Sequence, residues 1–241
     1  MPTTTDRAVI LAGGRGARLR PYTVVLPKPL MPIGEYPILE VVVRQLACHG
    51  FRHVTMAVNH QADLIRAFFG DGARWGLKID YSLETVPLST IGPLKLIDDL
   101  PEQFLLMNGD VLTDLNLREF CERHVSAGRL FTISAAARAH VIDYGVLEVD
   151  GNSRLCRFHE KPANSYLVSM GVYAVNRSVV QGVPSDSKYG FDDLMSDMLE
   201  RGEPVDVEPY GGYWLDIGRP EDYERAIDEF ETHRRKLLPD G

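Results

Sequence analysis

The sequence predicts an α/β fold: a doubly wound, mostly parallel sheet flanked by helices. Three observations favour it. Short apolar runs alternate with helix-like segments through the first half of the chain. The first of these runs passes directly into a glycine-rich turn, which is typical of the carboxyl edge of a parallel sheet. The chain has 241 residues, 44% hydrophobic and 25% charged, which is enough for one large domain with a substantial core.

The first half of the chain reads as strands and helices in alternation. Residues 8–12 (AVILA) predict a buried strand, and residues 37–50 predict a helix with Pro37 in its first turn and Gly50 at its end. Further strands are expected at 53–59, 78–84 and 104–110, and further helices at 61–70 and 117–128. This order predicts parallel strands joined by crossover helices.

After about residue 130 the pattern changes to strand-like runs with short connections. Such runs lie at 130–137, 144–150, 154–161, 166–175 and 205–218, and helices are expected at 191–202 and 219–238. No linker, low-complexity tract or repeat is visible. We therefore expect one domain over residues 1–241, whose second half adds strands to the first sheet.

Composition excludes several classes of protein. The net charge of −8 argues against a nucleic-acid-binding protein, which would usually be basic. No apolar stretch reaches the roughly 18 residues typical of a membrane span, and the start MPTTTDR lacks a signal-peptide core. Cys48, Cys121 and Cys156 have no metal or disulfide spacing, so we expect small buried residues in a reducing compartment, the cytoplasm.

The stretch LAGGRGARLRPYTVVLPKP (11–29) combines flexible and basic residues. Glycine lets backbone N–H groups approach phosphate oxygens closely, and it tolerates positive φ. Arg18 can bridge phosphate oxygens with its planar guanidinium, and Lys28, between two prolines, adds a compact charge. The stretch suits a polyphosphate, although a tight turn with solvated basic residues stays an alternative. It matches neither G-x-x-x-x-G-K-[ST] nor G-x-G-x-x-G, which argues against a P-loop and a nicotinamide dehydrogenase.

The longer pattern LAGGRGARLRPYT…PKPLMPIG resembles the signature of the sugar-1-phosphate nucleotidylyltransferases, most closely the mannose- or heptose-1-phosphate guanylyltransferases. Further segments follow in the order expected for that family: ETVPLSTIGPL (84–94), NGD (108–110), YGV (144–146), EKP (160–162) and WLDIGRPEDY (214–223). The resemblance implies a single Rossmann-like nucleotidyltransferase domain, with a nucleotide-binding half at about 8–130 and a sugar-phosphate-binding half at 131–241. It also implies a form without the C-terminal β-helix of many relatives.

The resemblance implies the reaction as well: a nucleoside triphosphate and a sugar 1-phosphate give a nucleoside-diphosphate sugar and pyrophosphate. Arg18 and Lys28 match the catalytic basic residues. The positions that match nucleotide-binding residues are Leu11, Ala12, Gly13, Gly14, Gly16, Glu84, Leu88, Ser89 and Asn108. Those that match sugar-phosphate-binding residues are Gly145, Glu160, Lys161 and Ser169. Asp110 and Asp216 match two carboxylates that bind Mg²⁺, although strand-end aspartates are usually turn or cap residues.

The sequence departs from the family in the segment usually written GTAGA. Ser89, Ile91 and Pro93 replace Gly, Ala and Ala, and Ala17 stands where threonine is common. The resemblance implies that Glu84 faces the Watson–Crick edge of the nucleobase. An ionised carboxylate can accept hydrogen bonds from the two donors on that edge of guanine, so we favour GTP, with dTTP, UTP and CTP as alternatives. A catalytically silent subunit that binds sugar nucleotides is the alternative of another class, and a homodimer is one candidate assembly. The nucleotide and the sugar phosphate are the expected partners, with no nucleic acid and no membrane.

Overall fold

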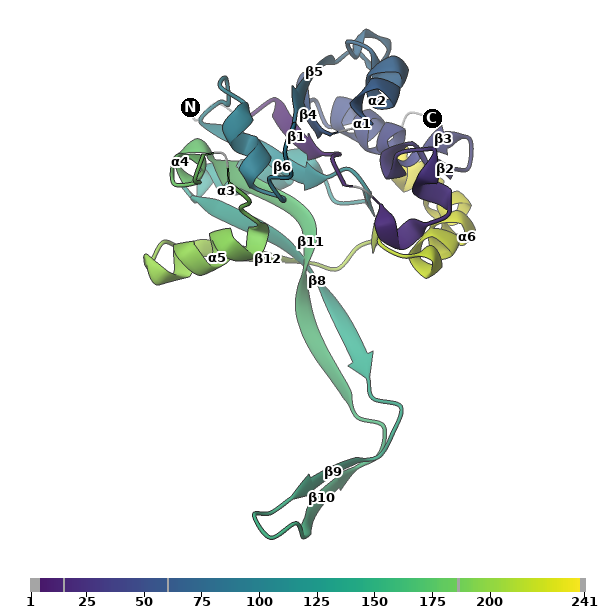
Figure 1. The fold of residues 1–241 in the computed structure, drawn as a ribbon, viewed down its shortest axis with the longest axis vertical. Coiled ribbons are helices and arrows are strands. Elements are labelled where there is room, and N and C mark those ends of the chain that lie inside the picture. Colours follow the sequence, from purple (N-terminus) through teal and green to yellow (C-terminus); the bar gives the residue numbers. More distant parts are fainter. Residues whose placement is uncertain (1–4, 15, 60, 186, 239–241) are drawn as a thin grey trace.

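The computed structural model describes residues 5–14, 16–59, 61–185 and 187–238. At its centre lies a seven-stranded sheet with the order β12-β8-β11-β6-β1-β4-β5 (Figure 1). Its strands are β1 (Arg7–Leu11), β4 (His53–Val58), β5 (Lys78–Leu83), β6 (Gln103–Asn108), β8 (Phe131–Val141), β11 (Ala163–Asn176) and β12 (Val205–Tyr210). Strand β11 runs antiparallel to β6 and β8, and the other four pairings are parallel. The predicted mostly parallel mixed sheet is confirmed.

Helices cover both faces of this sheet, and the apolar run in β1 shows why. Ala8 and Ile10 pack into one apolar cluster, whereas Val9 packs into a second one on the other face. A strand buried on both faces has no polar side to alternate with, so its sequence is continuously apolar. The helices are α1 (Ile38–Cys48), α2 (Ala62–Phe69), α3 (Leu117–Ser126), α4 (Arg177–Gln181), α5 (Phe191–Glu200) and α6 (Pro220–Leu237).

Two pairs of short strands and five 3₁₀ helices complete the described part of the fold. Strands β7 (Val111–Thr113) and β13 (Trp214–Asp216) pair with each other, as do β2 (Pro32–Ile33) and β3 (Tyr36–Pro37). The 3₁₀ helices are η1 (Ala17–Leu19), η2 (Tyr22–Val24), η3 (Lys28–Leu30), η4 (Ala73–Trp75) and η5 (Gly92–Leu96). The run predicted as one strand over 205–218 is therefore two strands, because Gly211 and Gly212 interrupt it and β13 joins a different sheet.

The second half of the chain differs most from expectation because two of its strands extend far beyond the main sheet. Strands β8 and β11 continue past the main sheet as a two-stranded ribbon, and β9 (Val146–Val149) and β10 (Leu155–His159) form a hairpin at its tip. We call residues 137–168 the arm. Figure 1 shows the arm projecting away from the rest of the molecule, which we call the body.

The cysteine prediction is correct for one residue and wrong for two. Cys121 is buried on α3, and burial raises the pKa of its thiol to about 12. Cys48, the last residue of α1, is exposed, and so is Cys156, which lies at an irregularity in the β9–β10 pairing. Among the described residues, no helix is long and apolar enough to cross a membrane.

Candidate active site

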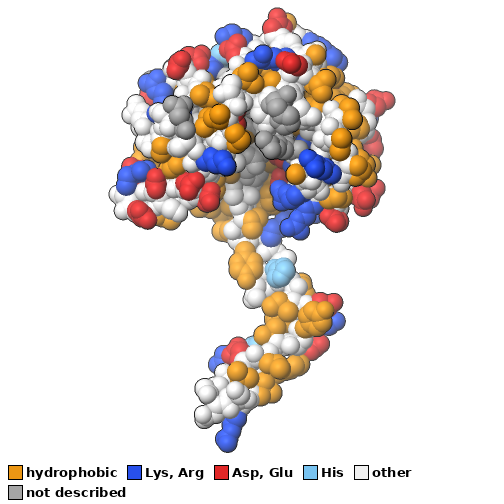
Figure 2. Space-filling model, in the orientation of Figure 1, with side chains coloured by type: hydrophobic (Ala, Val, Ile, Leu, Met, Phe, Trp, Pro, Cys, Tyr) orange, Lys and Arg blue, Asp and Glu red, His pale blue; other side chains and the backbone are white. Residues whose placement is uncertain are grey.

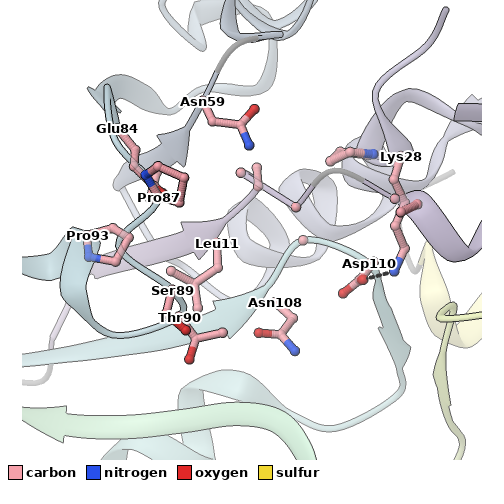
Figure 3. A pocket seen from close by; sticks show the side chains of 18 of the residues that line it. Leu11, Lys28, Asn59, Glu84, Pro87, Ser89, Thr90, Pro93, Asn108 and Asp110 are labelled. Atoms are coloured by element: carbon pink, nitrogen blue, oxygen red, sulfur yellow. Dashed lines mark hydrogen bonds and ion pairs between the residues drawn. The ribbon is translucent and has the colours of Figure 1, made fainter. Parts of the chain in front are cut away.

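A pocket of about 630 Å³ lies at the carboxyl ends of β1, β4 and β6. Parallel α/β sheets bind ligands at this edge because strand ends and loops converge there. Most of the predicted nucleotide-site residues line the pocket, together with both predicted catalytic residues and one predicted metal ligand: Leu11, Ala12, Gly13, Gly14, Gly16, Arg18, Lys28, Glu84, Ser89, Asn108 and Asp110. Figure 3 shows Glu84 and Pro87 at one side of it and the Lys28–Asp110 pair at the other.

The glycine loop keeps backbone exposed to the pocket. Around Gly14, a Cβ would meet nothing within 4 Å, so this part of the loop is open. Gly16 has a φ of +59°, and a Cβ there would lie 2.8 Å from Thr23 Cγ2. The Thr23 hydroxyl donates a hydrogen bond to the carbonyl of Gly16 at 2.7 Å, which holds this tight turn. Gly16 is thus required by both conformation and space.

Lys28 and Asp110 form an ion pair across the pocket floor. Lys28 begins η3 between Pro27 and Pro29, which restrict the backbone there, and its side chain is held by burial, at 9% exposure, and by the pair with Asp110. Asp110 follows β6 after Gly109, where a Cβ would lie 3.1 Å from Ile10 Cγ2. The prolines and the glycine therefore fix the two charges against each other.

Asp216, the second predicted metal ligand, does not line the pocket but lies beside Asp110, which does. The β7–β13 pairing sets Asp216 opposite Val111, and the Ile217 N–H donates to the carbonyl of Asp110 at 3.1 Å. Burial, and then the nearby charge of Asp110, raise the pKa of the Asp216 carboxyl above its ordinary value. Arg18 and Asp216 both border Gly218: a Cβ on that glycine would lie 3.6 Å and 3.4 Å from them.

The opposite end of the pocket is formed by the segment after β5. One Glu84 oxygen, Oε1, accepts a hydrogen bond from the Leu88 N–H at 2.7 Å, and the other carboxylate oxygen lies 3.6 Å from a Cβ placed on Gly13. Leu88 itself is buried, so it supports the pocket through its backbone and does not line it. Ser89 lines the pocket with a φ of +70°, a conformation that glycine adopts without strain.

The four predicted sugar-phosphate residues do not line this pocket. Gly145, Glu160 and Lys161 lie on the arm, and Ser169 lies where the arm joins the body and hydrogen-bonds Tyr173 at 3.0 Å. Lys161 pairs with Asp143 at 3.0 Å, and a Cβ on Gly145 would lie 2.6 Å from the ring of Phe158. The structure thus brings most of the predicted nucleotide residues together and leaves the predicted sugar-phosphate residues apart from them.

Other lining residues escaped the sequence analysis, among them Asn59, Thr85, Val86 and Thr90. Asn59 directly follows β4, so the rule that polar residues at strand ends meet at one sheet edge points to it. Thr90 depends on a distant contact: its hydroxyl accepts a hydrogen bond from the Phe191 N–H at 2.8 Å. The local sequence around Thr90 does not predict this contact. Among the described residues, no three His, Cys, Asp or Glu side chains gather as a metal-binding group.

Comparison with known proteins gives a consistent result. The sequence pattern of the family described as "Nucleotidyl transferase" matches residues 7–233. A mannose-1-phosphate guanyltransferase of Yarrowia lipolytica is 36% identical over 231 residues, which cover 90% of this chain and 62% of the relative. A UTP–glucose-1-phosphate uridylyltransferase of Synechocystis is 33% identical over 241 residues, covering 92% and 62%. The chain therefore spans 62% of the length of these two curated relatives.

A solved structure shares the fold over nearly the whole chain. HddC from Yersinia pseudotuberculosis, complexed with GMP-PN, superimposes with a TM-score of 0.72 at 26% sequence identity. The match covers 93% of this chain and 99% of HddC.

Proposed function

The chain belongs to the nucleotidyl transferase family, and from this premise we propose that it transfers a nucleotidyl group from a nucleoside triphosphate to a sugar 1-phosphate. The products are a nucleoside-diphosphate sugar and pyrophosphate. One observation carries the proposal: a pocket at the carboxyl edge of the sheet combines an open glycine loop, Arg18, a buried Lys28 and a carboxylate, Asp110. Backbone N–H groups and fixed cations at such an edge suit a polyphosphate.

Charge is the main obstacle to this reaction. A phosphate oxygen of the sugar 1-phosphate attacks the α-phosphorus, and the bond from the α-phosphorus to the oxygen shared with the β-phosphorus breaks. Two anions must approach each other, so the protein has to neutralise and align them. Arg18 would hold the departing pyrophosphate, and Lys28 would hold the α-phosphate. The attacking oxygen is already ionised, so the reaction needs no general base.

The two carboxylates fit a magnesium ion. Mg²⁺ is commonly held by one or two protein carboxylates, with phosphates and waters in the remaining positions. Burial, and then the nearby charge of Asp110, raise the pKa of the Asp216 carboxyl, and a bound cation would relieve the repulsion between the two carboxylates. Magnesium would supply charge neutralisation and a template for the phosphates. Lys28 competes for Asp110 when no cation is bound.

For the base we propose guanine. Glu84 lines the pocket at the end away from the Lys28–Asp110 pair, and an ionised carboxylate can only accept hydrogen bonds (Figure 3). Guanine offers two donors on its Watson–Crick edge, whereas uracil and thymine offer one between two acceptors. The guanyltransferase of Yarrowia lipolytica supports this choice, and the uridylyltransferase of Synechocystis keeps UTP as the alternative. A mannose- or heptose-type sugar 1-phosphate is the proposed acceptor.

The direct test is a substrate panel. Purified protein is incubated with Mg²⁺, each of the five common nucleoside triphosphates and a set of sugar 1-phosphates, and released pyrophosphate is measured. We expect release only when both substrates are present, and most rapidly with GTP. No release from any pair, combined with tight binding of a nucleoside-diphosphate sugar, would contradict the proposal and indicate a non-catalytic binding subunit.

A further inference from the structure

The arm projects away from the body (Figures 1 and 2), and near its base Arg138 donates a hydrogen bond to the carbonyl of Trp214 at 3.1 Å. The β8–β11 ladder continues without a break from Ala135 opposite Ser169 to Val141 opposite Ala163. None of the residues from 137 to 169, all of which the structure describes, is buried. A two-stranded hairpin of this kind is at best marginally stable in water, because it buries too little apolar surface.

The tip of the arm has one apolar face and one charged face. Leu147 pairs with Phe158, and Val149 pairs with Leu155, so these four side chains share a face of the β9–β10 hairpin. They are 61%, 56%, 59% and 60% exposed, respectively. The opposite face carries Glu148, whose carboxylate lies 3.2 Å from the ring nitrogen of His159. The apolar face of an amphipathic sheet normally packs against another structural element or another protein surface.

The body exposes a second apolar surface beside the pocket. Between the glycine loop and Lys28, the chain exposes Tyr22 (53%), Val24 (64%) and Val25 (75%). These residues lie on or next to η2, which the Thr23–Gly16 hydrogen bond ties to the loop that lines the pocket. The Tyr22 ring contacts Tyr223, with 5.8 Å between the ring centroids, and the rest of this surface is exposed. One chain thus presents two exposed apolar surfaces, one on the arm and one beside the pocket entrance.

The pocket also lacks positive charge for a second phosphate. Among the described residues that line it, the cationic side chains are Arg18 and Lys28, and Lys28 is already paired with Asp110. A further cation stands on the arm: Lys161 is 57% exposed at its side chain and is paired only at the surface, with Asp143. A cation that could serve a second phosphate therefore lies on the arm, next to the apolar hairpin.

We propose that two copies of this chain exchange arms, so that each arm packs beside the other copy's pocket and brings Glu160 and Lys161 to it. This inference rests on the proposed function for the role of Lys161, and on the arm alone for the dimer. The unbroken ladder favours exchange over closure within one chain, because it holds the tip away from its own body (Figure 1). The arm, residues 137–168, is long enough to supply the roughly 20–30 residues that each side of a stable interface contributes.

Arm exchange between two copies produces a closed dimer with two-fold symmetry. If the arm of one copy contacts the second body, a two-fold axis brings the arm of the second copy to the first body. Both apolar surfaces are then covered in both copies, and no arm remains for a third copy. A dimer is therefore expected, and not an open filament.

The first test is the mass in solution, which does not depend on activity. Light scattering of the full chain should give about twice the monomer mass of 27.0 kDa. Leu147→Asp, on the apolar face, should yield monomers with unchanged circular dichroism. Arg157→Gln, on the charged face of the same hairpin, should stay dimeric. A wild-type monomer at micromolar concentration, or a Leu147→Asp dimer, would overturn the proposal.

The second test separates exchange from closure within one chain. Differently tagged copies carrying Lys161→Ala and Arg18→Ala are co-expressed, and the mixed dimer is isolated through both tags. Each variant alone should be nearly inactive. With exchanged arms, one of the two pockets receives an intact arm, so the mixed dimer should recover roughly half of wild-type turnover. A mixed dimer no more active than its parents, or failure to isolate one, would overturn the proposal.

The two tests keep this inference distinct from the proposed function. If wild type transfers no nucleotide to any sugar phosphate, the proposed function fails, and the mass measurement still decides the arm exchange. If wild type is active but monomeric, the proposed function stands and the exchange fails.

Discussion

Arg18 illustrates what a single side chain contributes to the proposed reaction. It lies on η1, exposed at the pocket, with no part in the core. Arg18→Ala should therefore leave the free energy of unfolding within about 0.5 kcal/mol of wild type. Turnover should fall about 10²-fold or more, the scale of losing one preorganised electrostatic contact. Steady-state pyrophosphate release measures it.

Arg20→Ala is the matched control for this variant, because Arg20 is an exposed arginine of the same loop that does not line the pocket. It should retain wild-type turnover. Equal turnover in the Arg18 and Arg20 variants would remove Arg18 from the catalytic residues.

The paired aspartates make a second prediction at this scale. Asp110→Asn and Asp216→Asn should each abolish most Mg²⁺-supported turnover, because a neutral amide is a poor ligand for a hard cation. The double variant should be little worse than either single one, since the two act as a unit. Turnover is measured across a magnesium titration, with Asp98→Asn as a control in the exposed loop before β6. Full activity of either single variant at low Mg²⁺ would show that the residue is structural.

Glu84 tests the choice of base. We expect wild type to show its highest kcat/KM with GTP, and Glu84→Gln to lose that preference, because glutamine presents a donor where the carboxylate only accepts. Glutamine can still accept the hydrogen bond from the Leu88 N–H, so the loop after β5 should keep its shape. The measurement compares kcat/KM for the five triphosphates in both proteins. A wild type that prefers UTP or dTTP would contradict the guanine proposal and leave nucleotidyl transfer standing.

Ser89 holds a backbone conformation that is uncommon for a residue other than glycine. The resemblance predicts glycine at this position, and Ser89 holds a φ of +70° that glycine adopts freely. The hydrogen bonds around it explain how the conformation persists: the Tyr189 N–H donates to the carbonyl of Leu88 at 3.0 Å, and the Ile91 N–H donates to the carbonyl of Tyr189 at the same distance. The Ser89 side chain adds a hydroxyl to the pocket wall.

At the scale of elements, His124 links a helix to the sheet. On α3 it is 1% exposed, and its ring nitrogens lie 2.7 Å from Thr132 Oγ1 on β8 and 3.0 Å from Gln103 Oε1 on β6. Burial, and then the charge of Arg129, lower the pKa of His124 from 6.5 to about 4. The folded protein therefore keeps this ring neutral where the unfolded chain would protonate it.

The lowered pKa of His124 makes the stability of the fold depend on pH in a defined direction. Between pH 6.5 and about pH 4 the unfolded state binds one proton more than the native state, so stability falls as the pH falls. The share from His124 is about 1.4 kcal/mol per pH unit, on the order of 3 kcal/mol over the whole window. Urea unfolding at several pH values should show a weaker dependence in His124→Gln. The exposed His140→Gln serves as the control, and an unchanged dependence in His124→Gln would contradict the account.

Most elements could be predicted from sequence because their signals are local. The run at β1 and the helix after Pro37 follow from apolar pattern and capping alone, and the structure places them within two residues of the predicted bounds. The split between β12 and β13 could not be predicted, because β13 is fixed by its pairing with β7, about a hundred residues earlier. Likewise the gathering of the predicted nucleotide residues at the pocket follows from strand ends, whereas the direction of the arm depends on the β8–β11 ladder and on its register shift between Ser169 and Tyr173.

At the scale of the whole molecule, the predicted site residues are divided between the body and the arm. The body gathers the glycine loop, the buried lysine and the carboxylates at one sheet edge, and the arm carries Glu160 and Lys161 beyond it (Figure 1). The resemblance to the nucleotidylyltransferases predicted both groups of residues but not their separation. Exchange of arms between two copies would reunite them at each pocket.

The most direct measurement of nucleotidyl transfer follows one oxygen. A sugar 1-phosphate labelled with ¹⁸O in its phosphate group is incubated with GTP, Mg²⁺ and the protein, and the products are analysed by ³¹P NMR and mass spectrometry. If the sugar phosphate attacks the α-phosphorus, all of the label appears in the nucleoside-diphosphate sugar, including the oxygen between its two phosphorus atoms, and the pyrophosphate carries none. Label in the pyrophosphate or in free phosphate, or the absence of any nucleoside-diphosphate sugar, would contradict the account.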